Sequence, residues 1–395
     1  MSPPVYGGFW GLSARDRGLW PELYCLHLKR TVLAPRLLEA NRVEPESRIV
    51  TEATAVRQPS GVWRVTSIVI VLVLAAAAGV ASIGSIVGRL FDLKLSTLSD
   101  PFPAEAARPP VSTGLAAGAQ NILLLGSDTW DEVNGSLVNI SKQRSDTIMV
   151  VHIPADRHHV YVMSILRDSW LDLPGFGSDK INAALSYGGV PLAVQTIEGL
   201  IGTRIDHVAL VDYAGYKGLT DTLGGVDILN PVGFQSSASD HYYPSGMQHL
   251  TGDETLAFAR EWRAFPDGDF QRVRNQQLVM RATLTKAMQR ETLTDPGKVS
   301  ALLSAVRPFI AVDEGLNVDY LTALAASLAS IRSTDFTFFT APTKGIGVTS
   351  DGQSIVNLDL QKLQAVQHAF QTDTLDTFEP EYQTMQTVPP VASAP

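Results

Sequence analysis

The chain has 395 residues, of which 45% are hydrophobic and 18% charged, which is typical of a folded protein with one large domain or two small ones plus tails. The formal net charge of -9 at pH 7 lacks the basic excess expected of a nucleic-acid-binding protein. A single cysteine, Cys25, excludes an intrachain disulfide framework and a zinc site built on several thiolates.

The first predicted element is a membrane-spanning helix at residues 65–88. This run contains no charged residue and is bracketed by Arg64 and Arg89. At about 1.5 Å of rise per residue it can cross a hydrocarbon core of roughly 30 Å. The run is longer than the apolar part of a signal peptide and begins far from the N-terminus, which favours an uncleaved anchor. The alternative interpretation is a long buried core helix.

Charge predicts the orientation of this anchor. Residues 1–64 carry nine Lys/Arg and six Asp/Glu, whereas the remainder carries 22 and 34. This bias predicts a cytoplasmic tail at 1–64 and a single-pass protein of the cell membrane with an extracytoplasmic C-terminal domain. Proline-rich residues 89–118 are typical of a stalk, and residues 373–395 of a disordered tail. Residues 119–372 are left for the folded domain.

Strand-like and helix-like segments alternate within that domain. Short apolar or β-rich runs predict strands at 121–126, 146–153, 159–165, 205–213, 224–230 and 336–340. Helical spacing, together with a capping box of Thr251 and Glu254, predicts helices at 190–202, 251–262, 270–291, 298–309 and 317–332. We therefore expect a three-layer α/β/α fold with a central mixed sheet, mainly antiparallel, preceded by one transmembrane helix.

Charged residues gather at the open end of one predicted hairpin. If residues 154–157 form its loop, Arg144 lies directly opposite Arg167. Two opposed arginines repel each other unless an anion or nearby carboxylates compensate, and Asp146 and Asp168 are the nearest carboxylates. The pattern indicates either an anion site or a surface salt-bridge cluster.

A second cluster lies around the loop between two predicted helices. Its charged members are Arg260, Arg263, Asp267, Asp269, Arg272 and Arg274. Arg272 and Gln276 share one helical face near the helix N-terminus, where the helix dipole favours an anion. Guanidinium groups bind phosphate oxygens bidentately, and carboxylates bind hard cations such as Mg²⁺. Together the two clusters predict a site for a pyrophosphate with its metal.

Seven motifs, in this order, resemble those of the LytR-CpsA-Psr family of cell-wall glycopolymer transferases. They are NILLLGSD (121–128), RSDT (144–147), SILRD (164–168), KINAALSYGG (180–189), LGGVDI (223–228), LTGDETLAFAR (250–260) and GDFQRVRNQQ (268–277). The resemblance covers about residues 119–290. It implies a phosphotransferase that moves a glycopolymer, such as a teichoic acid, capsule or arabinogalactan, from a membrane-borne polyprenyl pyrophosphate to peptidoglycan through a phosphodiester.

The resemblance also implies residue roles. Asp128 and Asp146 would hold Mg²⁺ or Mn²⁺, and together with Arg144 and Arg167 they are the expected catalytic residues. The residues expected to bind the pyrophosphate are Arg144, Arg167, Arg260, Arg263, Arg272 and Gln276. Asp168, Asp269 and Arg274 are expected to support them, and Asp128 or Asp269 is the candidate general base.

Three positions depart from the family pattern. Leu166 stands where proline is usual, and Trp262 and Asn275 stand where arginine is common. Either the adjacent Arg263 and Arg274 substitute, or the subgroup holds a different sugar phosphate. Two other functions remain open: a polyprenyl-pyrophosphate pyrophosphatase that uses water as acceptor, and a non-catalytic cell-envelope regulator (transcriptional attenuator).

Overall fold

The computed structural model describes residues 96–127, 131–133, 136–138, 144–212, 214–237 and 239–377, which all belong to one compact unit of the chain, residues 59–395. Within this part of the chain no helix combines the length and apolarity needed to cross a membrane. The predicted tail 1–64, the predicted membrane helix 65–88, Asp128 and residues 378–395 lie outside the described residues.

A seven-stranded sheet forms the centre of the described domain. Its strands, from edge to edge, are β1 (Ser96–Leu98), β14 (Ile310–Asp313), β9 (His207–Asp212), β2 (Gln120–Ser127), β5 (Thr147–Ile153), β6 (Val160–Ile165) and β15 (Phe336–Thr340). The mixed sheet is as predicted. However, three of its pairings are parallel and three antiparallel, so antiparallel pairs do not dominate it.

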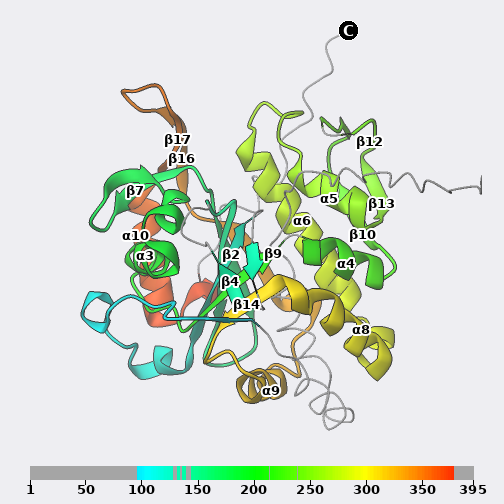
Figure 1. Ribbon diagram of the computed structural model, residues 1–395, viewed down its shortest axis with the longest axis horizontal. Coiled ribbons are helices and arrows are strands. Elements are labelled where there is room, and N and C mark those ends of the chain that lie inside the picture. Colours follow the sequence, from blue (N-terminus) through cyan, green and yellow to red (C-terminus); the bar gives the residue numbers. More distant parts are fainter. Residues whose placement is uncertain are drawn as a thin grey trace, which may run out of the picture. The chain divides into compact units, whose positions relative to one another are not determined.

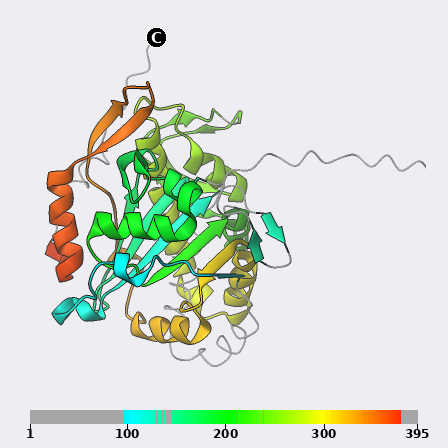
Figure 2. The ribbon, with the colours of Figure 1, turned by 60° about the vertical axis from the view of Figure 1, so that its left-hand side comes forward.

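Helices cover both faces of this sheet and create three layers (Figure 1). On β2, Ile122 and Leu124 face one apolar core, and Leu123 and Leu125 face the other, so the strand is apolar on both sides. The first core contains residues of α6 (Asp269–Ala287), α8 (Pro296–Val306) and α9 (Val318–Ser327). The second contains residues of α3 (Ala183–Ile201) and α10 (Leu360–Thr372), which lie side by side in Figure 2 in green and orange-red.

The predicted 190–202 helix begins earlier than expected. Helical residues start at Ala183, and the chain breaks from helical geometry at Gly188 and Gly189 before it continues through Pro191. Gly189 has φ +65°, a conformation that side-chain-bearing residues rarely adopt. A Cβ atom on Gly188 would lie 2.5 Å from Leu192 Cβ. Both glycines are therefore needed for this bend.

A second, four-stranded sheet follows β6 in the chain. Its strands in order are β16 (Thr343–Val348), β17 (Ser354–Leu358), β7 (Ser169–Leu173) and β8 (Gly177–Lys180). Residues 166–168 connect β6 of the central sheet directly to β7 of this one. The end of the predicted hairpin therefore lies at the junction of two sheets.

The remaining elements surround these sheets. The short strand pairs are β3 (Asp131–Val133) with β4 (Ser136–Val138), β10 (Val226–Asn230) with β13 (Gly246–Leu250), and β11 (Phe234–Gln235) with β12 (Tyr242–Tyr243). The further helices are α4 (Ala214–Thr222), α5 (Gly252–Arg260), α7 (Arg290–Leu293), η1 (Glu105–Ala107), η2 (Gly114–Gly118), η4 (Arg307–Phe309), η5 (Ser333–Asp335) and η6 (Leu375–Thr377). The predicted capping box is confirmed, because Thr251 and Glu254 bond each other's backbone at the start of α5.

The predicted register of the β5–β6 hairpin is wrong by two residues. Ile148 pairs with Ile165 and His152 with Tyr161, so residues 154–159, rather than 154–157, connect the strands. The turn is longer because Arg157 adopts a left-handed conformation with φ +60° and Asp156 Oδ1 accepts a hydrogen bond from the backbone of His158. This register does not place Arg144 opposite Arg167.

Residues 96–118, which were predicted to be part of a stalk, belong to the folded domain. Strand β1 extends the central sheet by parallel pairing with β14. Farther along, Arg108 forms a salt bridge of 2.6 Å with Glu198 of α3, whose side chain is 1% exposed. The prolines of this segment shape a chain that packs on the domain instead of a separate spacer.

Candidate functional site

Charged side chains converge where β5 begins, β6 ends and α6 begins. Arg167 Nη1 donates a hydrogen bond to Oδ1 of Asp146, the residue before β5. Its Nε lies 3.8 Å from Asp168 Oδ2 and 3.7 Å from Oδ1 of Asp269, the first residue of α6. The corrected hairpin register thus replaces the predicted arginine–arginine contact with an arginine surrounded by three carboxylates.

Two further cations join this group. Arg272 Nη2, one helical turn beyond Asp269, pairs with Asp269 Oδ1, and its side chain is largely buried. Lys180, the last residue of β8, places its Nζ 3.1 Å from Asp168 Oδ1. Arg167, Arg272 and Lys180 with Asp146, Asp168 and Asp269 are called the charged cluster below. No role was predicted for Lys180, although it opens one of the recognised motifs.

Three buried polar atoms of the charged cluster have no hydrogen-bond partner among the described residues. They are Arg167 Nε, Arg272 Nε and Asp269 Oδ2. Leaving such groups unpaired costs about 1–3 kcal/mol each, and native structures contain few of them. Two unpaired guanidinium donors beside the N-terminus of α6 are suited to the oxygens of an anion.

Burial and neighbouring charges shift two pKa values in the charged cluster. Burial alone would lower the pKa of Arg167, but Asp269, Asp146 and Asp168 outweigh it, so the pKa is raised and the guanidinium stays charged. Burial raises the pKa of Asp269, and the charges of Arg272 and Arg167 offset this only in part. Asp269 is therefore more basic than an ordinary aspartate.

Three predicted anion-binding residues lie at or near these elements. Gln276 is on the same side of α6 as Arg272, and its Oε1 accepts a hydrogen bond of 3.4 Å from Thr147, the first residue of β5. Arg144 is exposed two residues before Asp146. Arg260 ends α5 with a partly buried side chain.

Two predicted residues do not join the charged cluster. The exposed Arg263 lies with its Cζ 4.6 Å from the ring centroid of Trp262. Arg274 pairs with Asp267 and donates from Nε to Gln271 Oε1 at 2.9 Å. Neither Arg263 nor Arg274 therefore belongs to the charged cluster.

Asn275 has a structural explanation for its departure from the family pattern. Its side chain is 1% exposed, and its Nδ2 donates to the backbone oxygens of Phe258 at 3.1 Å and Glu261 at 3.3 Å. These bonds tie the end of α5 to α6. Asn275 thus holds the two helices together and does not line the anion site.

An exposed aromatic pair lies next to Lys180 in the chain. The rings of Phe176 and Tyr187 are stacked at 5.3 Å between centroids and 18° between planes, and both are about half exposed. Tyr187 donates to Asp179 Oδ2 at 2.6 Å, a bond that raises the pKa of its phenol, while the charge of Arg144 opposes that rise. Sequence reasoning missed this pair, although Tyr187 belongs to the KINAALSYGG motif.

Comparisons with known proteins identify the family of this chain. The LytR_cpsA_psr family model matches residues 98–372. Cell wall biosynthesis protein LcpA of Corynebacterium glutamicum is 29% identical over 305 residues, which cover 67% of this chain and 57% of LcpA. The polyisoprenyl-teichoic acid–peptidoglycan teichoic acid transferase TagU of Bacillus mycoides is 37% identical over 180 residues, or 45% of this chain and 56% of TagU.

This chain thus spans less than two thirds of the length of both curated relatives. Among solved structures, B. subtilis TagV matches with a TM-score of 0.53 and 24% identity over 65% of this chain and 97% of TagV, and supports the fold. Because the family model covers most of the described domain, including the charged cluster, the chain belongs to the LytR_cpsA_psr family.

Proposed function

We propose that this protein is a membrane-anchored phosphotransferase that moves a glycopolymer from a polyprenyl pyrophosphate carrier to peptidoglycan through a phosphodiester bond. The observation that carries the proposal is the convergence of Arg167 and Arg272 on Asp269, with one buried Nε on each arginine that makes no hydrogen bond among the described residues. Family membership and the names of LcpA and TagU support a cell-wall polymer as the substrate class.

The uncharged run at 65–88 supports the anchor, because a long-chain lipid carrier stays in the bilayer. The predicted orientation places residues 96–377 outside the cell, where peptidoglycan is found. Anchoring would hold the charged cluster close to the membrane surface that supplies the lipid substrate.

In the proposed reaction, the acceptor hydroxyl oxygen bonds to the phosphorus next to the sugar. The bond from this phosphorus to the bridging oxygen breaks, and the lipid monophosphate leaves. Arg167 and Arg272 neutralise negative charge on the transferring group, and catalysis rests on positioning and charge stabilisation. Asp269 is suited to take the proton of the hydroxyl, since burial raises its pKa and its Oδ2 is unpaired among the described residues.

The other members of the charged cluster would hold the two guanidinium groups in position. Asp146 contacts Arg167 directly, and Asp168 lies on the Nε side of the same guanidinium. Lys180 in turn holds Asp168. Gln276, Arg144 and Arg260 would contribute further contacts to the pyrophosphate.

A divalent cation, Mg²⁺ or Mn²⁺, is part of the proposal. Asp146 and Asp128 would hold it: Asp146 precedes β5, Asp128 follows β2, and Gly126 of β2 pairs with Thr147 of β5. Two aspartates are enough for Mg²⁺, because this ion commonly uses one or two carboxylates plus substrate phosphates. When bound, the cation would neutralise charge on the pyrophosphate.

Two apolar features beside the charged cluster suit the rest of the donor. Phe176 and Tyr187 offer ring faces on which a sugar can stack. A small pocket of about 50 Å³ is lined by Leu166 and Phe270, the chain neighbours of Arg167 and Asp269, and by Val273 among others, and would receive the first part of the prenyl chain.

Turnover by the full chain tests the proposal. Purified protein would be mixed with Mg²⁺ and a polyprenyl pyrophosphate-linked saccharide, with and without peptidoglycan, and both phosphate-linked product and released lipid phosphate would be measured. We expect release that depends on peptidoglycan, and its loss in Arg167→Ala and Arg272→Ala. Arg307→Ala, which removes an exposed arginine of η4, is the control and should match wild type.

Two results would count against the proposal. If lipid phosphate were released equally fast with and without peptidoglycan, the protein would be a pyrophosphatase that uses water as the acceptor. Equal product formation by wild type, Arg167→Ala and Arg272→Ala would remove the charged cluster from the reaction.

A further inference from the structure

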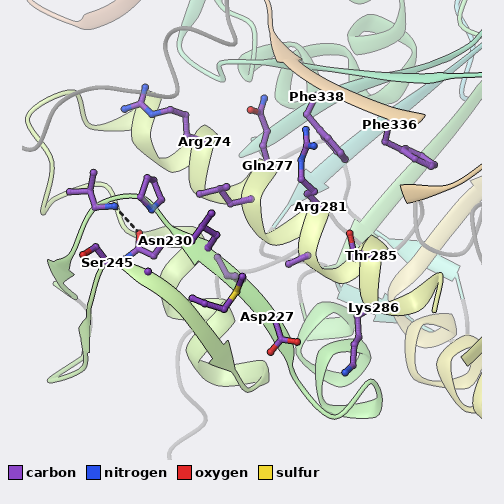
Figure 3. Close-up of a pocket in the computed structure, with 18 of the residues that line it drawn as sticks. Asp227, Asn230, Ser245, Arg274, Gln277, Arg281, Thr285, Lys286, Phe336 and Phe338 are labelled. Carbon is purple, nitrogen blue, oxygen red and sulfur yellow. Dashed lines mark hydrogen bonds between the residues drawn. The ribbon is translucent and has the colours of Figure 1, made fainter. Parts of the chain in front are cut away.

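A second cavity lies on the other side of α6. It has a volume of about 940 Å³ and lies between α6, the β10–β13 hairpin and β15 (Figure 3). The helix contributes Gln271, Arg274, Leu278, Arg281 and Thr285, which recur every three or four residues and so form one stripe. Arg281 follows Arg272 of the charged cluster by nine residues, which at about 100° per residue places it on the opposite face.

Two cations of this cavity have no carboxylate partner among the described residues. They are Arg281, which is exposed to the cavity, and Lys286, which is partly buried. Of the other charged lining residues, Arg274 pairs with Asp267, and the Asp227 carboxylate lies 2.8 Å from Nδ1 of the His249 ring. Protein around Arg281 removes part of its hydration and lowers its pKa. With Arg281 and Lys286 against the single carboxylate of Asp227, the lining carries a net positive charge.

The rest of the lining combines an apolar inner wall with neutral hydrogen-bonding groups. Arg281 Cζ lies 5.3 Å from the ring centroid of Phe338, and Phe336 of the same strand also faces the cavity (Figure 3). The exposed Ser245 lines the hairpin side and the exposed Thr285 the helix side, whereas the buried amide of Asn230 is held by the backbone of Val232, Tyr243 and Pro244. Exposed hydroxyls pair with sugar hydroxyls, and the buried rings of Phe336 and Phe338 supply an apolar inner wall.

From these features we infer that the cavity between α6, the β10–β13 hairpin and β15 binds an anionic saccharide segment, with Arg281 and Lys286 as its charge contacts. An isoprenoid chain fits less well, because it would remove water from both cations without offering them a partner. A neutral saccharide would leave the positive charge uncompensated. The bound anion can be a carboxylate, as in peptidoglycan, or a phosphodiester, as in a polymer substrate.

This site rests on the proposed function only for the source of its ligand, because saccharide binding needs no turnover. It would give a transferase a holding point remote from the reacting phosphorus. Binding there would fix part of a long substrate and raise the local concentration of the reacting group at the charged cluster.

Equilibrium binding to the purified full chain tests the inference, with four probes. They are a disaccharide muropeptide with free carboxylates, a disaccharide joined to glycerol by a phosphodiester, chitotetraose as a neutral saccharide, and geranylgeranyl phosphate as an isoprenoid. At least one of the two anionic saccharides should bind more tightly than chitotetraose and lose affinity with added salt. The tighter of the two identifies the carboxylate or the phosphodiester as the source.

The variant pair Arg281→Gln and Lys286→Gln should weaken that binding about tenfold or more, the loss expected for charge-assisted contacts. The matched control, Lys298→Gln with Arg307→Gln, removes two exposed cations of α8 and η4 and should leave affinity unchanged. An unchanged affinity in the cavity pair would overturn the inference. So would equal binding of chitotetraose, or competition by geranylgeranyl phosphate that is lost in the cavity pair.

The two proposals fail separately. Arg167→Gln should abolish transfer and leave muropeptide or phosphodiester binding intact, because Arg167 does not line this cavity. Wild-type protein that binds the anionic saccharide but transfers nothing would refute the proposed function alone.

Discussion

Asp269 Oδ1 lies 3.7 Å from Arg167 Nε, and the same carboxylate also pairs with Arg272. One aspartate thus holds two guanidinium groups that come from residues more than 100 positions apart in the chain. Its own Oδ2 has no hydrogen-bond partner among the described residues, and burial raises its pKa. Asp269 therefore links the two arginines of the charged cluster, and burial disfavours its own ionised form.

The raised pKa of Asp269 predicts how replacement changes stability with pH. Because the folded protein binds this proton more tightly than the unfolded chain, the contribution of Asp269 is full below its ordinary pKa of about 3.8 and is lost as pH rises through the raised value. The melting temperature of Asp269→Asn, measured relative to that of wild type, should therefore rise as pH increases from 4 to 7.

Thermal unfolding of both proteins across this range measures the effect. Asp351→Asn is a useful comparison, because hydrogen bonds from Thr349 and Gln353 lower the pKa of Asp351, so its effect on the melting temperature should change below about pH 4 and stay nearly constant from pH 4 to 7. A difference between Asp269→Asn and wild type that stays constant with pH would show that the Asp269 carboxyl is not perturbed by folding.

Lys180 should act as a positioning residue. Lys180→Met removes the contact that holds Asp168 beside Arg167, and we expect turnover to fall about tenfold, equivalent to about 1.4 kcal/mol. Lys180→Arg keeps the charge and should recover most of this loss. Steady-state kinetics that determine KM and kcat separately would measure this recovery. A Lys180→Arg variant as slow as Lys180→Met would indicate a structural role instead.

Metal dependence should follow Asp146. Chelation should stop transfer, and added Mg²⁺ or Mn²⁺ should restore it, because phosphoryl transfer relies on neutralised phosphate charge. Asp146→Asn should raise the metal concentration that gives half-maximal activity, as one of two proposed carboxylate ligands is lost. Full activity in the presence of chelator would exclude this part of the proposal.

The segment before β2 should contribute to stability without touching the reaction. Arg108→Leu leaves the buried Glu198 carboxylate with only the backbone of Ile205 and should cost about 3 kcal/mol of unfolding free energy. Adding Glu198→Leu should return part of that loss. Denaturant unfolding of wild type, the single and the double variant would test this; a single variant as stable as wild type would show that this pair is not coupled to folding.

Much of the domain follows from local patterns in the sequence. The apolar runs at 121–126 and 147–153 are strands because they are buried on both faces, and Thr251 with Glu254 marks a helix start through bonds only three residues apart. Helical periodicity also suffices to separate Arg274 from Arg272, since residues two positions apart lie on different sides of a helix. The prediction that Arg274 supports the anion site overlooked this.

Other features depend on information that local patterns do not contain. The register of the β5–β6 hairpin depends on the left-handed Arg157, a conformation that the residue type does not favour. The place of Lys180 follows from the pairing of β7 with β8 and from the short link that joins β7 to the central sheet. The packing of residues 96–118 rests on Arg108 meeting Glu198, 90 residues away.

Binding of inorganic pyrophosphate to the full chain tests the central claim most directly, because it measures the charged cluster without lipid or acceptor. Arg167→Gln and Arg272→Gln should each raise the Kd about tenfold or more, and the double variant should lose less than the two effects combined, since both arginines contact one ligand and one aspartate. Arg307→Gln should bind as wild type does. If wild type, the two single variants and the double variant bound pyrophosphate equally, the charged cluster would not be the anion site.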